Sequence, residues 1–329
     1  MLVLLCVAVI DADLQSWLEE SGLRFTATTA LAGDLSQRRY FRVLCDDGSR
    51  LLAAHYPDSL RPSMERFVRA RALLAGAGVR VPEVHRTSFE RGWMLVEDLG
   101  AATLYESAGL ASPIRTGLFL AAAESAGRIA SLDAAVVAEL GSPPLDAAAL
   151  RRELEPTFEF LLDPHGLDGS PAERRDLLAG LGELCDQLGV APLVPCHRDY
   201  MARNLVPVEG TVAVIDFQDL RLGPSAYDVA SLLNDSFFPD RALEGVLLPQ
   251  RWSAPPAREA YSRAVVQRTL KACGTFARFA ASGNPRHVPL IAPTLARAVP
   301  HLELLPETSA VFGALRRWWT SELTRAAIC

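Results

Sequence analysis

Residues 197–204 read HRDYMARN, and this segment is the strongest indication of fold and function in the chain. It places Asp199 and Asn204 five positions apart. A carboxylate can orient a hydroxyl group and accept its proton, and an amide oxygen is a suitable ligand for Mg²⁺. A neighbouring group, His197, could also act as a general base, but the aspartate is the better candidate. The segment therefore predicts a catalytic loop with Asp199 as the base.

A second acidic group lies a short distance downstream. Residues 212–215 read VAVI, an apolar run that predicts a buried strand, and Asp216 follows it directly. A strand holds a carboxylate rigidly at its end, and Mg²⁺ in nucleotide sites takes only one or two carboxylates besides phosphate oxygens. The loop and the strand together predict phosphoryl transfer, with Asn204 and Asp216 as the metal ligands.

The pattern of predicted helices and strands divides the chain into two parts. Residues 13–23 predict a short amphipathic helix, and residues 40–44 and 51–56 predict a hairpin around the turn at 46–49. A second helix through residues 64–75 and a second hairpin, 81–89 with 93–96, follow. After Gly100 the sequence becomes Ala/Leu-rich and helical. We therefore expect an α+β protein with a small mixed part, 1–100, and a larger helical part, 101–329.

Composition limits the classes of partner. The net charge is -6 and the pI about 5.6, which argues against a nucleic-acid partner because phosphate binding needs a concentrated basic surface. The apolar run at residues 1–10 lacks a preceding Lys or Arg and is too short to span a membrane, so we expect an N-terminal extension and not a targeting signal. The six cysteines form no C-x-x-C pair, which is typical of buried thiols in a cytoplasmic protein.

The two motifs resemble those of the protein-kinase-like superfamily, in its aminoglycoside/choline phosphotransferase branch. Further stretches are similar to the bacterial anomeric N-acetylmuramate/N-acetylglucosamine kinases of cell-wall recycling. They are RRYFR at 38–42, DFQD at 216–219 with Gly223-Pro224 and Tyr227-Asp228 after it, and the region 267–278. The resemblance extends from about Gly33 to Pro306.

This resemblance implies a two-lobed kinase-like fold, with a small antiparallel sheet in a nucleotide-binding N-terminal lobe and a helical C-terminal lobe that carries the catalytic and acceptor sites. It implies ATP and Mg²⁺ as cofactors and a small sugar as the substrate, with no protein partner and no membrane. Glu97, Asp98 and Leu99 would form the hinge that holds the adenine. Asp228 would accept backbone N–H bonds from the catalytic loop; the alternative is a helix N-cap.

The sequence departs from the family pattern where the ATP phosphates should bind. No glycine-rich motif is present, only Gly33, and the strand that should carry a lysine reads LAAHY at 52–56. The nearby cations are Arg38, Arg39 and Arg42. We expect Arg39 or Arg42 to contact the phosphates, because an arginine can hold phosphate oxygens bidentately. The alternative is that these arginines are merely solvated.

The acceptor is less constrained. Asp219 and Arg221 lie close to the metal motif and could reach the substrate. The basic residues Arg268 and Lys271 suit a sugar that carries a carboxylate, although with Arg278 they could equally form an exposed helical face. An aminoglycoside or amino-alcohol kinase is the rival enzyme, and the missing lysine leaves a nucleotide-binding pseudokinase module as the rival of another class.

Overall fold

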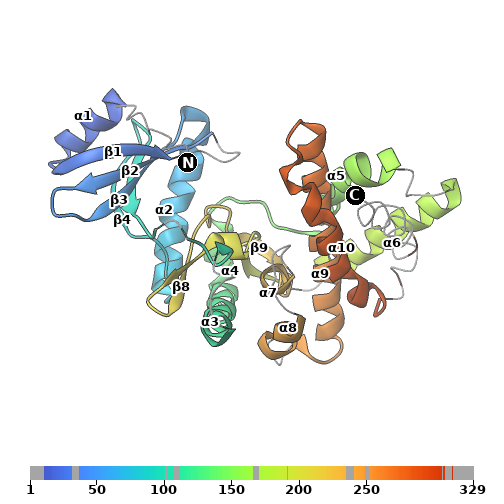
Figure 1. Ribbon diagram of the computed structural model, residues 1–329. Helices are drawn as coiled ribbons and strands as arrows, with labels where there is room; N and C mark the ends of the chain where they lie inside the picture. The colour runs from blue at the N-terminus through green and yellow to red at the C-terminus, as the bar shows by residue number, and fades with distance from the viewer. Residues whose placement is uncertain are drawn as a thin grey trace. The chain divides into compact units, whose positions relative to one another are not determined.

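The computed structural model describes residues 11–31, 37–100, 102–106, 112–165, 170–190, 192–234, 241–248, 252–305, 307 and 313 (Figure 1). The chain divides into two compact units: Met1–Ala102 with Ala213–Asp219, and Thr103–Val212 with Leu220–Cys329. The boundary predicted from the sequence lies after Gly100 and leaves residues 213–219 in the second part. The apolar run at 1–10 and the Gly33 loop lie outside the described residues.

The first unit is built on a five-stranded antiparallel sheet with the strand order β1-β2-β3-β5-β4. Its elements are α1 (Ala12–Glu20), β1 (Phe25–Leu31), β2 (Arg39–Cys45), β3 (Arg50–His55), α2 (Arg61–Gly76), β4 (Val84–Ser88) and β5 (Trp93–Glu97). Both predicted hairpins are present. Strand β1 was not predicted, because its sequence, FTATTAL, does not alternate between apolar and polar residues. None of its residues is buried in the structure.

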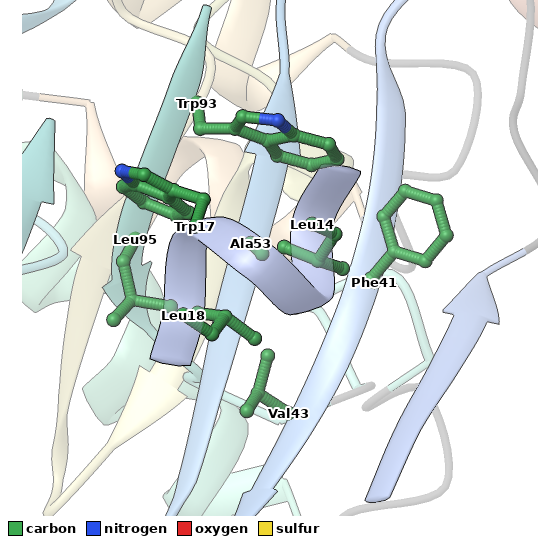
Figure 2. Close-up of a cluster of buried hydrophobic side chains, with 8 residues drawn as sticks. All are labelled: Leu14, Trp17, Leu18, Phe41, Val43, Ala53, Trp93 and Leu95. Atoms are coloured by element: carbon green, nitrogen blue, oxygen red, sulfur yellow. The ribbon is translucent and has the colours of Figure 1, made fainter. Parts of the chain in front are cut away.

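Helix α1 covers one face of this sheet, as Figure 2 shows. Leu14, Trp17 and Leu18 project from the helix and meet side chains of β2, β3 and β5. The rings of Trp17 and Trp93 stack with their centroids 6.1 Å apart. Side chains alternate between the two faces of a strand, so Phe41 and Val43 pack beneath α1 while their neighbours on β2 point to the other face.

The first unit also includes residues 213–219, which return to it from the middle of the second unit. Val214 donates its backbone N–H to Arg80 O (2.8 Å), and the ring of Phe217 stacks on Phe67 of α2 with centroids 4.5 Å apart. These contacts hold the segment that carries Asp216 against the sheet domain.

The second unit is mainly helical. Its elements are α3 (Ser112–Ala130), α4 (Ala134–Ala138), α5 (Ala147–Pro156), a π-helical turn (Thr157–Leu162), α6 (Pro171–Val190), β6 (Leu193–Cys196), β7 (Leu205–Val208), β8 (Thr211–Val214, which ends in the first unit), β9 (Arg221–Pro224), α7 (Tyr227–Leu233), α8 (Arg241–Leu247), α9 (Ala257–Ala281) and α10 (Ile291–Leu302). No described helix combines the length and the apolar character that a membrane span requires.

Helix α9 is the centre of this unit (orange in Figure 1) and packs against α5, α6, α7, α10 and the π-helical turn. Gly274 makes one of these approaches possible, because a Cβ atom there would lie only 2.4 Å from Thr157 N. The Thr157 hydroxyl donates to Leu270 O (2.8 Å) at the same contact. The close packing fixes the position of α9, which carries Arg268 and Lys271.

Strands β6 and β9 pair antiparallel, with Cys196 opposite Arg221. The segment 197–204 leaves the end of β6 and finishes in a short 3₁₀ turn, Ala202–Asn204. The predicted catalytic loop therefore starts from a strand end and is closed by a turn, both of which are parts of the same unit.

Candidate active site

The loop at 197–204 is held by a buried carboxylate on α7. Asp228 accepts hydrogen bonds from the backbone N–H groups of His197 (2.6 Å) and Arg198 (3.0 Å). Burial raises the pKa of Asp228, while the charge of His197 and the two N–H donors oppose that rise. The role implied by the resemblance is confirmed: this aspartate anchors the loop, and the alternative of a helix N-cap is wrong, because α7 has no side-chain cap.

Arg198 has a φ of 76°, which is the left-handed region that side chains other than glycine rarely adopt. Such a conformation costs about 1–3 kcal/mol and persists only where the surroundings impose it. The bond to Asp228 and the ion pair that the Arg198 side chain makes with Glu153 (2.8 Å) supply that constraint. The strained residue immediately precedes Asp199, so the strain helps to set the direction of the Asp199 carboxylate.

Asp199 lies among cations. Its Oδ1 accepts hydrogen bonds from Arg268 Nη1 (3.0 Å) and Lys271 Nζ (3.4 Å), and its Oδ2 lies 3.7 Å from Arg198 Nη1. Burial alone would raise the pKa of this carboxyl, but the charges of Lys271, Arg268 and Arg198 outweigh it and hold the pKa far below its usual range. Asp199 is therefore ionised at neutral pH.

Glu153 of α5 is a second carboxylate in the same cluster, and the sequence analysis missed it. It accepts from Arg198 Nη2 (2.8 Å) and Tyr227 OH (3.0 Å), and it pairs with Lys271 Nζ (3.3 Å). Burial, together with the charge of Arg268, lowers the pKa of Lys271 to about 8, although both carboxylates oppose this. Glu153 balances the cations that would otherwise crowd Asp199.

A cavity opens beside Asp199 in the second unit. The side chains that line it are mostly polar: Asp199, Met201, Arg203, Ser231, Asn234, Arg268, Thr269, Lys271, Ala272, Thr275, Phe276 and Thr294. Arg268 is only 7% exposed and also donates to Ser231 Oγ (3.0 Å). The alternative of an exposed helical face is therefore wrong for Arg268 and Lys271; Arg278 alone of the three is exposed.

Two further polar groups line this cavity. Within the part of the chain that the structure describes, Asn234 Oδ1 and Thr294 Oγ1 are buried and have no hydrogen-bond partner. Asn234 is held by Tyr261, whose hydroxyl accepts from its Nδ2 (2.8 Å). An unpaired buried polar atom costs free energy, and both atoms belong to residues that line the cavity.

Asn204 and Asp216 carry the predicted metal-ligand atoms, in the second and first unit respectively. Asn204 Nδ2 donates to Asp199 O (2.8 Å), and because a carbonyl can only accept, the amide oxygen is the atom left for a cation. Asp216 has a φ of 60°, and its exposed carboxylate accepts from Arg38 Nη2 (3.1 Å). An amide oxygen and a carboxylate are the oxygen ligands that Mg²⁺ prefers, so each of these residues carries an atom suited to the ion, and their role as metal ligands remains a prediction.

Comparison with known proteins decides the family. Residues 27–264 match the Phosphotransferase enzyme family. The chain belongs to that family. It is 35% identical over 280 residues to the N-acetylmuramate/N-acetylglucosamine kinase of Pseudomonas aeruginosa, covering 78% of each chain, and 30% identical over 264 residues to the kinase of the same name from Neisseria meningitidis, covering 76% of this chain and 78% of that one.

Solved structures show the fold of this phosphotransferase. An ADP-bound aminoglycoside phosphotransferase superposes with a TM-score of 0.61 at 16% identity, covering 92% of this chain and 99% of that one. A choline/ethanolamine kinase family protein from Mesorhizobium loti gives 0.55 at 16% identity, covering 89% and 93%. The predicted kinase-like α+β fold is confirmed, and the phosphotransferase is a kinase. At such low identity these structures say nothing of the acceptor.

The arginines predicted to meet the ATP phosphates have carboxylate partners within the first unit of the phosphotransferase. Arg39 is 54% exposed and pairs with Asp11 (2.7 Å). Arg42 makes two bonds to Asp98, Nε to Oδ2 (2.5 Å) and Nη2 to Oδ1 (3.3 Å). Their contact with nucleotide remains a prediction.

The predicted hinge begins at the end of β5. Glu97 Oε2 accepts from Arg80 Nη1 (2.8 Å), which lowers the pKa of Glu97, and the Glu97 backbone N–H donates to Glu83 O (2.9 Å). That amide is thus engaged within the sheet region. Leu99 is half-buried beyond it, and adenine binding at 97–99 remains a prediction.

The two acceptor residues predicted near the metal motif lie in different units. Asp219 ends the segment that belongs to the first unit. Arg221 begins β9 in the second unit, where its Nη1 donates to Pro143 O (3.3 Å). Their contact with the substrate also remains a prediction.

Glu153, Asn234 and Thr294 are the residues of this phosphotransferase that sequence reasoning missed. Each lies in or at the end of a helical segment whose sequence contains no recognisable motif. The one available signal was a charged or polar residue on the apolar stripe of a helix, and that signal is weak because such positions are also used for structural hydrogen bonds.

Proposed function

We propose that this kinase transfers the γ-phosphoryl group of ATP, with Mg²⁺, to the anomeric hydroxyl of N-acetylmuramate or N-acetylglucosamine. The observation that carries the proposal is the cavity at Asp199, in which a carboxylate base stands beside Arg268 and Lys271. The relatives from Pseudomonas aeruginosa and Neisseria meningitidis are named as kinases of the same two sugars, which supports this acceptor.

Asp199 would orient the acceptor hydroxyl and take its proton. ATP with its bound Mg²⁺ supplies the phosphoryl group and neutralises its developing charge. A carboxylate with so low a pKa is a weak base. It therefore suits an anomeric hydroxyl, which is more acidic than an ordinary alcohol and gives up its proton more easily. The strained Arg198 and the anchor at Asp228 keep the carboxylate in position while the hydroxyl approaches.

The cations around Asp199 would bind the acid group of N-acetylmuramate. Arg268 and Lys271 both lie within 3.4 Å of Asp199 Oδ1. A lactyl carboxylate in the cavity would share these cations through charge-assisted hydrogen bonds. Sharing them weakens their hold on Asp199 and so raises its pKa toward the usual range, which makes it a better base. The acceptor would thereby activate the residue that deprotonates it.

The same electrostatics disfavour the rival acceptors. A polycationic aminoglycoside would meet the positive charges of Arg203, Arg268 and Lys271 on the cavity wall. A quaternary ammonium acceptor usually needs several aromatic rings around it, and among the described lining residues Phe276 is the aromatic one. A pseudokinase module would bind nucleotide and phosphorylate none of these acceptors, which the acceptor assay below measures.

The acceptor assay compares each sugar with its 1-O-methyl glycoside, in the presence of ATP and Mg²⁺. We expect both free sugars to be phosphorylated and both methyl glycosides to be inert, because the methyl group blocks the oxygen that attacks. A mass increase of the sugar and release of ADP are the measurements, and an amino alcohol and an aminoglycoside serve as comparison acceptors. Phosphorylation of a methyl glycoside would contradict the anomeric position, and activity confined to the amino alcohol would contradict the sugar.

Metal binding is expected to require the nucleotide. Asn204 and Asp216 offer two protein ligands, whereas Mg²⁺ prefers six and relies on phosphate oxygens and water for the rest. Calorimetric titration of Mg²⁺ should give little heat with the protein alone and clear binding in the presence of a non-hydrolysable ATP analogue. Asp216→Asn should weaken Mg²⁺ binding in the presence of the ATP analogue and leave the titration of the protein alone unchanged. Tight Mg²⁺ binding without nucleotide would place the metal at a different site.

A further inference from the structure

The face of the sheet opposite α1 carries an arginine where a kinase of this fold would need a cation. The register pairs Tyr40 of β2 with Ala54 of β3. Side chains two residues apart on a strand share a face, so Arg38, which immediately precedes β2, and Tyr56, which follows β3, extend the face that bears Tyr40 and Ala54. Strand β3 itself presents no lysine on this face.

Arg38 is held firmly in that position. Its guanidinium lies 5.8 Å from the ring centroid of Tyr40 and 5.8 Å from that of Tyr56. Its side chain is only 16% exposed. An arginine confined by two aromatic rings has lost most of its rotamer freedom before any ligand arrives, which lowers the entropic cost of using its donors for recognition.

The partner of Arg38 distinguishes it from the other arginines of the unit. Arg38 Nη2 donates to Asp216 Oδ1 (3.1 Å), and Asp216 is the carboxylate assigned to Mg²⁺ above. Asp216 is in turn held by Gln218, whose Nε2 donates to the same oxygen (2.9 Å). All three residues belong to the first unit. Any phosphate whose oxygens share a metal ion with Asp216 therefore comes within reach of the Arg38 fork.

We propose that Arg38 takes the place of the missing lysine and binds the α- and β-phosphate oxygens of the nucleotide. The inference rests on the proposed ATP-dependent function. Without nucleotide, Arg38 neutralises Asp216. When the nucleotide enters with Mg²⁺, Asp216 turns to the metal and the guanidinium turns to the phosphates, so that every charge keeps an opposite partner. The exchange also explains why the metal site should be weak on its own, because the arginine competes with Mg²⁺ for the same carboxylate.

This assignment differs from the expectation that Arg39 or Arg42 meets the phosphates. Arg39 alternates to the α1 face, where it lies over Phe41 and pairs with Asp11. Arg42 shares the face of Arg38, but both of its bonds go to Asp98, whose side chain is only 3% exposed. Moving Arg42 to a phosphate would leave that carboxylate buried without its charged partner, with only the Gly100 N–H still bonded to it, which is costly. Arg38 faces no such penalty, because its partner gains the metal.

The experiment measures nucleotide affinity directly, by calorimetry with a non-hydrolysable ATP analogue and Mg²⁺, and with adenosine as the probe that lacks phosphates. Arg38→Gln should weaken binding of the ATP analogue about 10- to 100-fold, as expected for a lost hydrogen bond to a charged group. It should leave adenosine affinity and the KM of the acceptor unchanged. Arg38→Lys should recover part of the loss, since a lysine keeps the charge but not the fork.

The matched control is Arg91→Gln, which removes an arginine of the same unit that pairs with a carboxylate at the same distance, Glu20 at 3.1 Å. It should bind both probes as the unchanged protein does. Full affinity for the ATP analogue in Arg38→Gln overturns the proposal, as does an equal loss for adenosine, which would mean a structural role. A loss seen only in Arg39→Gln or Arg42→Gln would restore the earlier expectation. If the unchanged protein bound neither probe, the proposed function would fail first.

Discussion

Asp199→Asn is expected to lower kcat by about 10²–10⁴-fold, the usual contribution of a positioned general base. The substitution keeps the shape of the side chain and removes its capacity to accept a proton. The fold should survive, because Glu153 continues to balance Arg198 and Lys271. Nucleotide affinity should also survive.

The split between kcat and KM makes this test specific. Arg268 and Lys271 lose one anionic partner in Asp199→Asn, so they become freer to pair with an acidic acceptor. The KM for N-acetylmuramate should therefore stay level or fall while kcat collapses. Asp186→Asn is the matched control, because Asp186 is an exposed carboxylate that pairs with Arg151. Near-normal kcat in a folded Asp199→Asn protein would remove Asp199 from its catalytic role.

Asp228→Ala is expected to lower both stability and kcat. It removes the common acceptor of the His197 and Arg198 N–H groups. Each buried donor left unpaired costs about 1–3 kcal/mol, so with two such donors the free energy of unfolding should fall by about 2–6 kcal/mol. Arg198 would lose one of the two contacts that constrain its positive φ, so the direction of Asp199 would be held less firmly. We expect kcat to fall at least about tenfold as a result.

Urea denaturation and steady-state kinetics measure the two effects of Asp228→Ala. The matched control is Asp146→Ala, because Asp146 caps α5 by accepting one N–H, from Ala149 (2.8 Å). Loss of an ordinary cap costs about 1 kcal/mol, and it should leave kcat nearly unchanged. Equal destabilisation by the two substitutions, with kcat preserved in both, would reduce Asp228 to an ordinary cap.

The parts of the fold that sequence reasoning predicted correctly are those with strong local signals. The β2–β3 hairpin follows from alternating β-forming residues around a DDGS turn, and the burial of β8 follows from its continuous apolar run. Strand β1 has neither signal. It lies at the edge of the sheet, paired with β2 only, so its side chains never needed to alternate.

The candidate site divides in the same way. Asp199, Asn204 and Asp216 stand in compact motifs whose spacing carries chemical meaning. Glu153, Arg268 and Lys271 come from α5 and α9, 46 residues before Asp199 and 69 and 72 residues after it, and no local pattern connects them to the loop. Their contact depends on how helices pack, and here on a glycine that lets α9 approach Thr157. Arg38 was within the set of candidates, but the sheet register distinguishes it only from Arg39, and its pairing with Asp216 is what distinguishes it from Arg42, which pairs with Asp98.

The return of residues 213–219 to the first unit has a consequence for recombination between relatives. A single crossover near residue 100 would pair the Phe67 and Arg38 of one parent with the Phe217 and Asp216 of another. Chimaeras with one breakpoint would therefore mix two halves of a stacked and ion-paired contact. To exchange acceptor specificity between such kinases, the second unit must therefore be transferred in two pieces, so that residues 213–219 stay with the N-terminal sheet of the same parent.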